Sequence, residues 1–246
     1  MNILITNDDG IDAEGIRILA RTLSDTHRVL VVAPASEKSA TSHSLTILKY
    51  MDFKRRDFDG IEAYSLEGTP ADCVKFFMLQ MRTFTPDLVL SGINHGLNLG
   101  RDVHYSGTAS AAVEGALLGI RSAALSMASD CSLQKFADFS EFIKDYIPTL
   151  TNFNGTGGAY NINYPNAEKD QVKGVAFSRL GGITFNDRYE SEDNGGGRYM
   201  LTGEPLEQVQ PHTDVWYVRR GHIAVTPLIS DITDFEALKK LEDSGI

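Results

Sequence analysis

Four short apolar stretches, separated by longer segments of mixed polarity, set the pattern of the first half of the chain. Each is rich in aliphatic and β-branched residues and is followed closely by turn residues, which is typical of strands that are buried on both faces of a sheet. The predicted strands are Asn2–Thr6, Arg28–Ala33, Asp87–Ser91 and Ser122–Met127.

The segments between these strands have helical spacing. Apolar residues recur at i, i+3, i+4 and i+7 from Ile16 to Leu23, and two more helices are predicted at about residues 69–81 and 108–118. Strands that alternate with helices predict parallel pairing through right-handed crossovers. We therefore expect an α/β fold with a Rossmann-like, doubly wound and mostly parallel sheet, helices on both of its faces, and a ligand site at the carboxyl ends of its strands.

Later segments depart from this pattern. Leu45–Leu48 and Ile61–Leu66 flank a polar stretch and are predicted as short inserted strands. A helix is predicted over about 133–150. Strand-like runs follow near Ala159–Ile162, Val172–Phe177, Trp216–Val218 and His222–Thr226.

The domain organisation follows from this change of pattern. We expect a Rossmann-like catalytic core over residues 1–130 and a smaller, β-rich C-terminal part over 131–246 that completes the sheet. The polar, glycine-rich segment 181–211 is predicted as either a mobile loop or an extended hairpin arm. A terminal helix with a capping residue is predicted at about 231–242.

Composition narrows the class of protein. The chain has 246 residues, of which 42% are hydrophobic and 23% are charged, as in a globular protein with an ample core. No apolar run approaches the roughly 18 residues that span a bilayer, and the N-terminus lacks a secretory signal pattern, so we expect a cytoplasmic protein without a membrane partner. Cys73 and Cys131 are isolated, which argues against redox or zinc chemistry.

Net charge bears on the partner. The formal net charge of −10 disfavours nucleic acid, because affinity for nucleic acid comes mainly from Lys and Arg side chains that neutralise phosphates. A small phosphate ester is still a reasonable ligand where a metal ion and a helix N-terminus supply local positive potential.

The first predicted strand ends in two adjacent carboxylates, Asp8 and Asp9, followed by Gly10. Two acids this close repel each other, and a divalent cation such as Mg²⁺, Mn²⁺ or Ca²⁺ is the natural counter-charge, since carboxylate oxygens are hard ligands. The alternative interpretation is a plain polar turn, because Asn, Asp and Gly all favour turns.

Polar residues also follow the other predicted strands. Ser39 lies in a hydroxyl-rich loop, Asn94 and Asn98 lie in a loop rich in Asn and Gly, and Ser106-Gly107-Thr108 leads into the alanine-rich helix. Each alone is explained by a solvated hydroxyl, a turn or a helix cap. Together, their oxygens suit a hard cation, and backbone N–H groups at a helix start suit phosphate.

Three histidines lie in the same loops: His43, His95 and His104. One of them could donate a proton to a leaving alcohol, although a histidine that is satisfied by its surroundings is the commoner case. Asp8 and Asp9 are the candidate bases for an attacking water, and the sequence does not choose between them.

Ordered sequence blocks cover nearly the whole chain. They are Ile3–Gly10 with Glu14-Gly15, His43–Thr46, Gly68–Val74, Ser91–Gly100, Tyr105–Thr108 with Glu114-Gly115, Asn161–Pro165, Thr213-Asp214 and Val225–Leu228. In this order they resemble the stationary-phase survival protein family, the SurE-type 5′/3′-nucleotidases. The chain departs from the family pattern at Ala40, where glycine is common, and just after Thr108.

The resemblance implies a metal-dependent phosphomonoesterase that acts on nucleoside 5′- and 3′-monophosphates and on short polyphosphate. It places one divalent cation per subunit, Mg²⁺ or Mn²⁺ with Ca²⁺ in crystals, on Asp8, Asp9, Ser39 and Asn94. It assigns the substrate side to Asn98 and to Ser106, Gly107 and Thr108. It also implies a homodimer or homotetramer whose C-terminal elements cross to the partner.

Two other classes of protein share some of these features. A receiver-like phospho-acceptor signalling domain also begins with a strand that ends in paired acids, but Gly92 stands where its acceptor aspartate is needed. The interpretation as a non-catalytic nucleotide-binding module has less support, because no Gly-x-Gly-x-x-Gly loop follows the first predicted strand.

Overall fold

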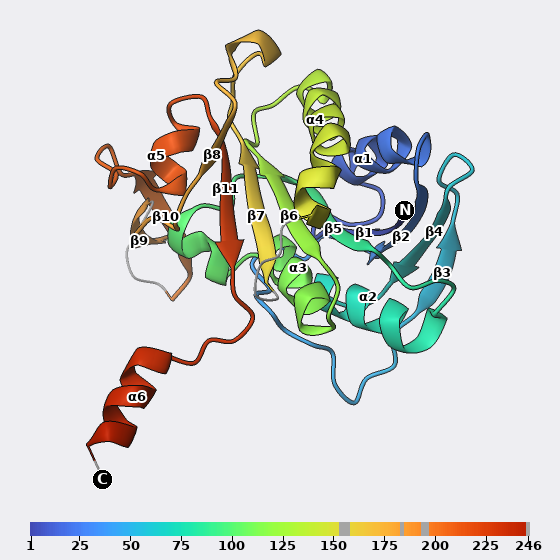
Figure 1. Ribbon diagram of the computed structural model, residues 1–246, viewed down its shortest axis with the longest axis horizontal. Coiled ribbons are helices and arrows are strands. Elements are labelled where there is room, and N and C mark those ends of the chain that lie inside the picture. The colour runs from blue at the N-terminus through green and yellow to red at the C-terminus, as the bar shows by residue number, and fades with distance from the viewer. Residues whose placement is uncertain (153–157, 183–184, 193–196, 245–246) are drawn as a thin grey trace.

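A nine-stranded, mostly parallel sheet forms the centre of the protein in this computed structural model, which describes residues 1–152, 158–182, 185–192 and 197–244 (Figure 1). The strand order is β3-β4-β2-β1-β5-β6-β7-β11-β8. Neighbouring strands are parallel except for β3 with β4 and β11 with β7. The predicted α/β fold is confirmed.

The elements have the following bounds. The strands are β1 (Asn2–Thr6), β2 (Arg28–Pro34), β3 (Phe53–Arg56), β4 (Glu62–Leu66), β5 (Leu88–His95), β6 (Ser122–Met127), β7 (Ala159–Tyr164), β8 (Val175–Phe177), β9 (Phe185–Ser191), β10 (Tyr199–Pro205) and β11 (Ile223–Leu228). The α-helices are α1 (Glu14–Ser24), α2 (Pro70–Phe76), α3 (Gly107–Leu117), α4 (Leu133–Asn152), α5 (Asp214–Val218) and α6 (Phe235–Asp243). Shorter turns of helix lie at η1 (Phe77–Met81), η2 (Gly100–His104) and η3 (Lys169–Gln171).

The two faces of the sheet bury different helices. Ile3 and Ile5 of β1 point into a core shared with α1 and α4, while Leu4 points into a core shared with α2. This alternation follows from the two-residue period of a strand. Figure 1 shows α1 and α4 on one side of the sheet and α2 and α3 on the other. The continuous apolar run of β1 is therefore explained by helices that cover both faces.

Two predicted strands were wrong. Leu45–Leu48 forms no strand; it lies in an exposed loop, where Leu48 has a left-handed φ of 57°. The strand that pairs with β4 on its outer side is β3, which comes from the polar stretch after this loop. Trp216–Val218 is the end of helix α5, because Thr213 caps that helix by accepting a hydrogen bond from Trp216 N.

Residues from the predicted arm form an antiparallel hairpin of β9 and β10, separate from the main sheet. The chain ends in α6, which Figure 1 shows projecting away from the body of the protein. None of the residues of α6 is buried. No helix in the described part of the chain is long and apolar enough to cross a membrane.

Candidate functional site

The carboxyl ends of β1, β2 and β5 meet around a cleft of about 430 Å³. The cleft is lined by Asp8, Asp9, Glu37, Ser39, Ala40, Asn94, His95, Asn98, Asp102, Tyr105 and Ser106. Six of the eight predicted site residues therefore lie in its wall. The other two, Gly107 and Thr108, open the helix α3 directly behind Asp8.

Asp8 is the most deeply placed carboxylate of the cleft, with 5% of its surface exposed. Thr108 N donates to Asp8 Oδ2 at 3.0 Å, and Thr108 Oγ1 donates to Asp8 Oδ1. Burial nevertheless raises the pKa of the Asp8 carboxyl to about 6, and the neighbouring charge of Asp9 also raises it, although the Thr108 hydrogen bonds lower it. The metal-free site therefore resists holding both negative charges.

Asp9 is half-buried beside Asp8. His95 N donates to Asp9 Oδ2 at 3.0 Å, which ties the end of β1 to the end of β5. Burial raises the pKa of this carboxyl as well. Two adjacent carboxylates that are both costly to ionise fit a divalent cation, which would offset the cost of burying their charges.

Ser39 is brought to the cleft by the loop that follows β2. Lys38 N donates to the backbone oxygen of Asp8 at 2.7 Å, so this loop is fixed to the end of β1 one residue before Ser39. The Ser39 hydroxyl donates to Glu37 Oε1, which turns its oxygen lone pairs away from Glu37.

Asn94 is aimed by a bulge in β5. The pairing of β5 with β6 shifts register between Ser91 and Asn94, and Gly92 in this bulge has a φ of 139° and leaves no room for a Cβ, which would lie 2.3 Å from the backbone oxygen of Leu125. Asn94 Nδ2 donates to the backbone oxygen of Gly96, so Oδ1 is the amide atom that could bind a cation.

The described residues contain no cluster of three His, Cys, Asp or Glu side chains able to hold a metal ion. A cation in this cleft would therefore depend on the two aspartates together with neutral oxygens. Ser39 and Asn94, predicted as ligands together with Asp8 and Asp9, are among the lining residues that carry such oxygens.

The N-terminus of α3 forms the back wall of the cleft. Ser106 is the capping residue and accepts from Ala109 N at 3.0 Å. Gly107 lies against Asp8, because a Cβ at this position would come within 3.0 Å of Asp8 Cβ. Both donors of Thr108 go to Asp8, so Thr108 holds this carboxylate in place, and its place on the substrate side stays a prediction.

Asn98 is held by a buried network that the sequence analysis did not assign. Asn98 N donates to Asn163 Oδ1 at 2.9 Å and Asn98 Nδ2 donates to Ser126 Oγ at 2.8 Å. The side-chain amides of Asn161 and Asn163 both donate to the backbone oxygen of Asn98. Two asparagines at alternate positions of an otherwise apolar strand were the available signal.

Asp214 is a second residue that sequence reasoning missed. Its carboxylate is fully buried and accepts backbone N–H groups from Gly100, Gly181 and Val215, each at 2.8 Å. Burial raises the pKa of this carboxyl, and the three hydrogen bonds oppose that rise. Asp214 therefore anchors the loop after Asn98 to helix α5 and to the root of the arm.

The three histidines have different surroundings. His43 Nε2 lies 2.9 Å from Glu114 Oε2, and Lys75 Nζ lies 2.7 Å from Glu114 Oε1, so His43 belongs to an ion-pair cluster behind the cleft. His104 is exposed. His95 is the histidine among the lining residues.

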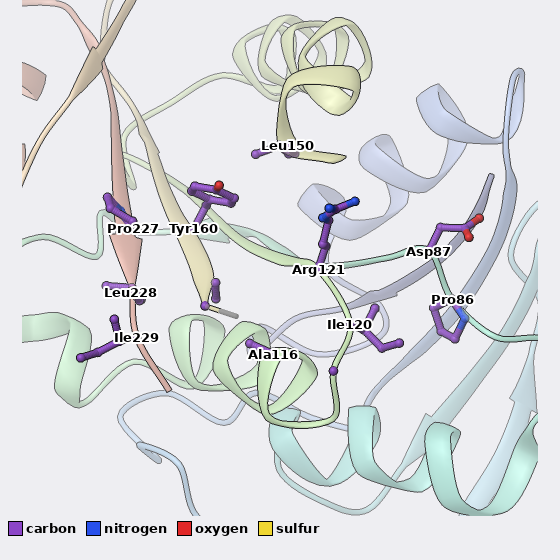
Figure 2. Close-up of a pocket in the computed structure, with 13 residues that line it drawn as sticks. Pro86, Asp87, Ala116, Ile120, Arg121, Leu150, Tyr160, Pro227, Leu228 and Ile229 are labelled. Carbon is purple, nitrogen blue, oxygen red and sulfur yellow. The ribbon is translucent and has the colours of Figure 1, made fainter. Parts of the chain in front are cut away.

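A larger cavity of about 640 Å³ lies at the opposite edge of the sheet (Figure 2). Figure 2 shows the aliphatic side chains of Ile120, Leu150 and Leu228 around it, with Asp87 and Arg121 as the charged groups. Asp87 already accepts a hydrogen bond from Asn2 N. This cavity contains no predicted site residue and lacks the paired carboxylates, so we place the functional site in the smaller cleft.

The fold and cleft define a Rossmann-like α/β protein with an acidic, oxygen-rich site at the carboxyl edge of its sheet. The family model described as "Survival protein SurE" matches residues 3–187. The chain belongs to this family, as the sequence blocks had indicated. The receiver-like alternative is not supported, because the position of the missing acceptor aspartate is Gly92, inside the bulge.

Several relatives match over almost their full length. The protein is 38% identical to a 5′-nucleotidase SurE of Clostridium botulinum (strain 657 / Type Ba4), with 98% of each chain covered. It is 40% identical to a 5′-nucleotidase SurE of Alkaliphilus metalliredigens (strain QYMF), with 100% of this chain and 99% of the relative covered. The crystal structure of the SurE protein from Aquifex aeolicus superposes with a TM-score of 0.86 at 33% identity, covering 100% of both chains.

Proposed function

We propose that the protein is a metal-dependent 5′-nucleotidase, which hydrolyses nucleoside 5′-monophosphates to nucleoside and phosphate. The observation that carries the proposal is the pair of neighbouring carboxylates, buried Asp8 and half-buried Asp9, in one cleft with Ser39, Asn94 and the start of α3. The names of the relatives supply the substrate class. We extend the proposal to 3′-monophosphates and short polyphosphate, which present the same terminal phosphoryl group.

The donor set fits one hard divalent cation, Mg²⁺ or Mn²⁺, held by Asp8, Asp9, Ser39 and Asn94. Such a cation, when bound, polarises a phosphoryl oxygen and makes a coordinated water more acidic. The protein groups align the substrate and stabilise charge, which is most of what phosphoryl transfer requires.

Each protein group has a role in this proposal. Both oxygens of Asp8 already accept hydrogen bonds from Thr108, so Asp8 is the less suitable base of the two aspartates. Asp8 therefore holds the cation. Asp9 accepts one backbone hydrogen bond, at Oδ2, and its Oδ1 takes the proton of the attacking water. Ser106 and the backbone of Gly107 bind the phosphate, with Asn98 on the neighbouring loop. His95 donates a proton to the leaving alcohol.

Asp8→Asn tests the function. Phosphate release from a nucleoside 5′-monophosphate in Mg²⁺ or Mn²⁺ should fall by at least about a hundredfold, because one charged ligand is lost. Asp12→Asn removes an exposed carboxylate paired with Arg56 and should stay within twofold of the wild type. Chelator should inactivate the wild type and added cation should restore it. Full activity of Asp8→Asn with an unchanged circular dichroism spectrum would remove the proposal.

Assembly and location belong to the same proposal. We infer a homodimer or homotetramer in which α6 and the arm contact another subunit, since α6 exposes its apolar residues and buries none. The division of the chain near residue 130 and the cytoplasmic location stay predictions.

A further inference from the structure

One aromatic side chain is largely exposed at the cleft. Tyr105 lines the cleft and leaves 63% of its surface exposed. Within the described residues its ring makes no aromatic contact and its hydroxyl makes no hydrogen bond. The indole ring of Trp216, by contrast, is packed: its ring centroid lies 5.3 Å from His212 and 5.0 Å from Tyr217, and Arg220 lies over its face.

The backbone of Tyr105 is fixed although its ring is not covered. Tyr105 N donates to the backbone oxygen of Asp102 at 2.9 Å, and Ser42 N donates to the backbone oxygen of Tyr105 at 3.0 Å. The next residue, Ser106, caps α3 and begins the proposed phosphate-binding segment. The backbone of Tyr105 is therefore held at a set place, one residue from the proposed phosphate site, and its ring extends from that place.

The rest of the cleft offers no comparable surface. Its other lining residues are carboxylates, amides, hydroxyls, one histidine and one alanine. These suit a cation and a phosphate, whereas a nucleobase needs a flat apolar face on which to stack. In a nucleotide the ribose separates the base from the phosphate, so a platform beside the phosphate site, and not within it, has the required arrangement.

We propose that Tyr105 stacks on the nucleobase and makes the enzyme prefer nucleotides over phosphate esters that lack a base. The proposal rests on the nucleotidase function proposed above. Because every base has a π-face, a stacking platform discriminates weakly among bases. The preference for any nucleotide over a base-free ester should therefore be larger than the preference among nucleotides.

The test compares two substrates in four proteins: wild type, Tyr105→Leu, Tyr105→Phe and a control, Tyr189→Leu, which removes an exposed tyrosine of β9. The substrates are adenosine 5′-monophosphate and ribose 5-phosphate. Tyr105→Leu should lower kcat/KM for the nucleotide by about 5- to 150-fold, mainly through KM, and lower the ratio between the two substrates by a similar factor. Tyr105→Phe and Tyr189→Leu should keep the wild-type ratio.

The outcomes separate this inference from the function on which it rests. If the wild type hydrolyses neither ester with any divalent cation, the proposed function fails. If the wild type is active and Tyr105→Leu leaves the ratio unchanged, whether both activities persist or both fall together, the stacking role is overturned. If Tyr105→Phe loses the preference as fully as Tyr105→Leu, the phenol hydroxyl and not the ring carries it, which also overturns stacking.

Discussion

Asp8 accepts two hydrogen bonds and yet remains hard to ionise. Its donors, Thr108 N and Oγ1, come from a single residue at the start of α3, where the helix dipole also favours negative charge. Burial outweighs these effects and carries the pKa of the carboxyl to about 6. The metal-free protein therefore holds this charge at some cost, which the proposed cation would offset.

The first prediction concerns that cost. Folding raises the pKa of the Asp8 carboxyl from 3.8 to about 6. The protonated carboxyl therefore contributes its full stability below about pH 4, and this contribution is lost as the pH rises through 6. Asp8→Asn removes the charge and can still accept from Thr108 N. In chelator, we measure by urea unfolding the free energy of unfolding of Asp8→Asn minus that of the wild type. This difference should increase by about 2–3 kcal/mol from pH 4 to pH 7.5. An equal difference at both pH values would contradict this.

The second prediction separates the two donors of Thr108. Thr108→Val removes the hydroxyl that donates to Asp8 Oδ1 and keeps the backbone donor. Loss of one hydrogen bond to a charged group costs about 1.5–3 kcal/mol, so cation affinity should fall about 10- to 150-fold by calorimetry. Thr108→Ser keeps the hydroxyl and should bind the cation nearly as well as wild type. Equal affinities for the valine and serine variants would show that the hydroxyl is unimportant.

At the scale of elements, the cleft depends on how α2, α3 and the loop after β2 are joined. Glu114 of α3 is almost fully buried and is shared by His43 of the loop and Lys75 of α2. The same loop is also tied to α2 where Thr69 Oγ1 donates to the backbone oxygen of Ser44 and Thr46 N donates to Asp72. This cluster fixes the loop that brings Ser39 to the cleft.

The third prediction is that Glu114→Gln destabilises the protein by about 1–2 kcal/mol at pH 7, because Lys75 loses its counter-charge and His43 loses a carboxylate partner, although both side chains are partly exposed and screened. His43, and to a smaller extent Lys75, lower the pKa of Glu114. Its stabilising effect is therefore present above about pH 4.5 and lost as the pH falls, so the variant and wild type should converge in acid.

The matched control is Glu236→Gln, which breaks the exposed pair with Lys240 in α6. It should change stability by less than about 0.5 kcal/mol. Equal effects of the two substitutions in urea unfolding at pH 7 would mean that burial of Glu114 gives it no special importance.

The sequence pattern predicted a helix or strand well where a few neighbouring residues were enough to specify it. The apolar run of Asn2–Thr6 identified β1, and the capping pair Thr69-Pro70 identified α2, because in both cases the signal lies within the segment itself. Leu45–Leu48 misled because its apolarity does not report a strand partner, and Trp216–Val218 misled because a cap at Thr213 overrides β-propensity.

The same reasoning explains what the sequence could and could not say of the site. Residues at strand ends could be grouped because parallel strands bring them to one edge. The supports could not be found, since they are long-range contacts: Asn163 acts on Asn98 across 65 residues and Asp214 on Gly100 across 114. Whether the grouped residues perform the assigned chemistry stays a prediction.

At the scale of the whole molecule, α6 buries none of its residues against the described part of its own chain. A helix of nine residues is marginal in water on its own, and α6 leaves Phe235, Leu238 and Leu241 exposed. Another subunit is the surface that would cover this stripe in the proposed assembly.

The fourth prediction is that Leu238→Glu lowers the sedimenting mass of the protein and leaves its unfolding midpoint in urea, measured below the association range, within experimental error of wild type. A charge on the apolar stripe opposes burial against a partner, while Leu238 is exposed in the described part of its own chain. Lys239→Glu introduces the same charge on a neighbouring exposed position and should leave the mass unchanged. Equal mass for all three proteins would exclude α6 from the assembly.

The wide spacing of the cleft residues along the chain has a consequence for biosynthesis. Asp8 emerges from the ribosome a hundred residues before Thr108, and Gly100 emerges 114 residues before Asp214. A nascent chain, or the product of a premature stop codon before these residues, carries the acidic pair but not the groups that orient it. Such fragments should not hydrolyse cellular nucleotides. We therefore expect activity only when translation of the protein is nearly complete.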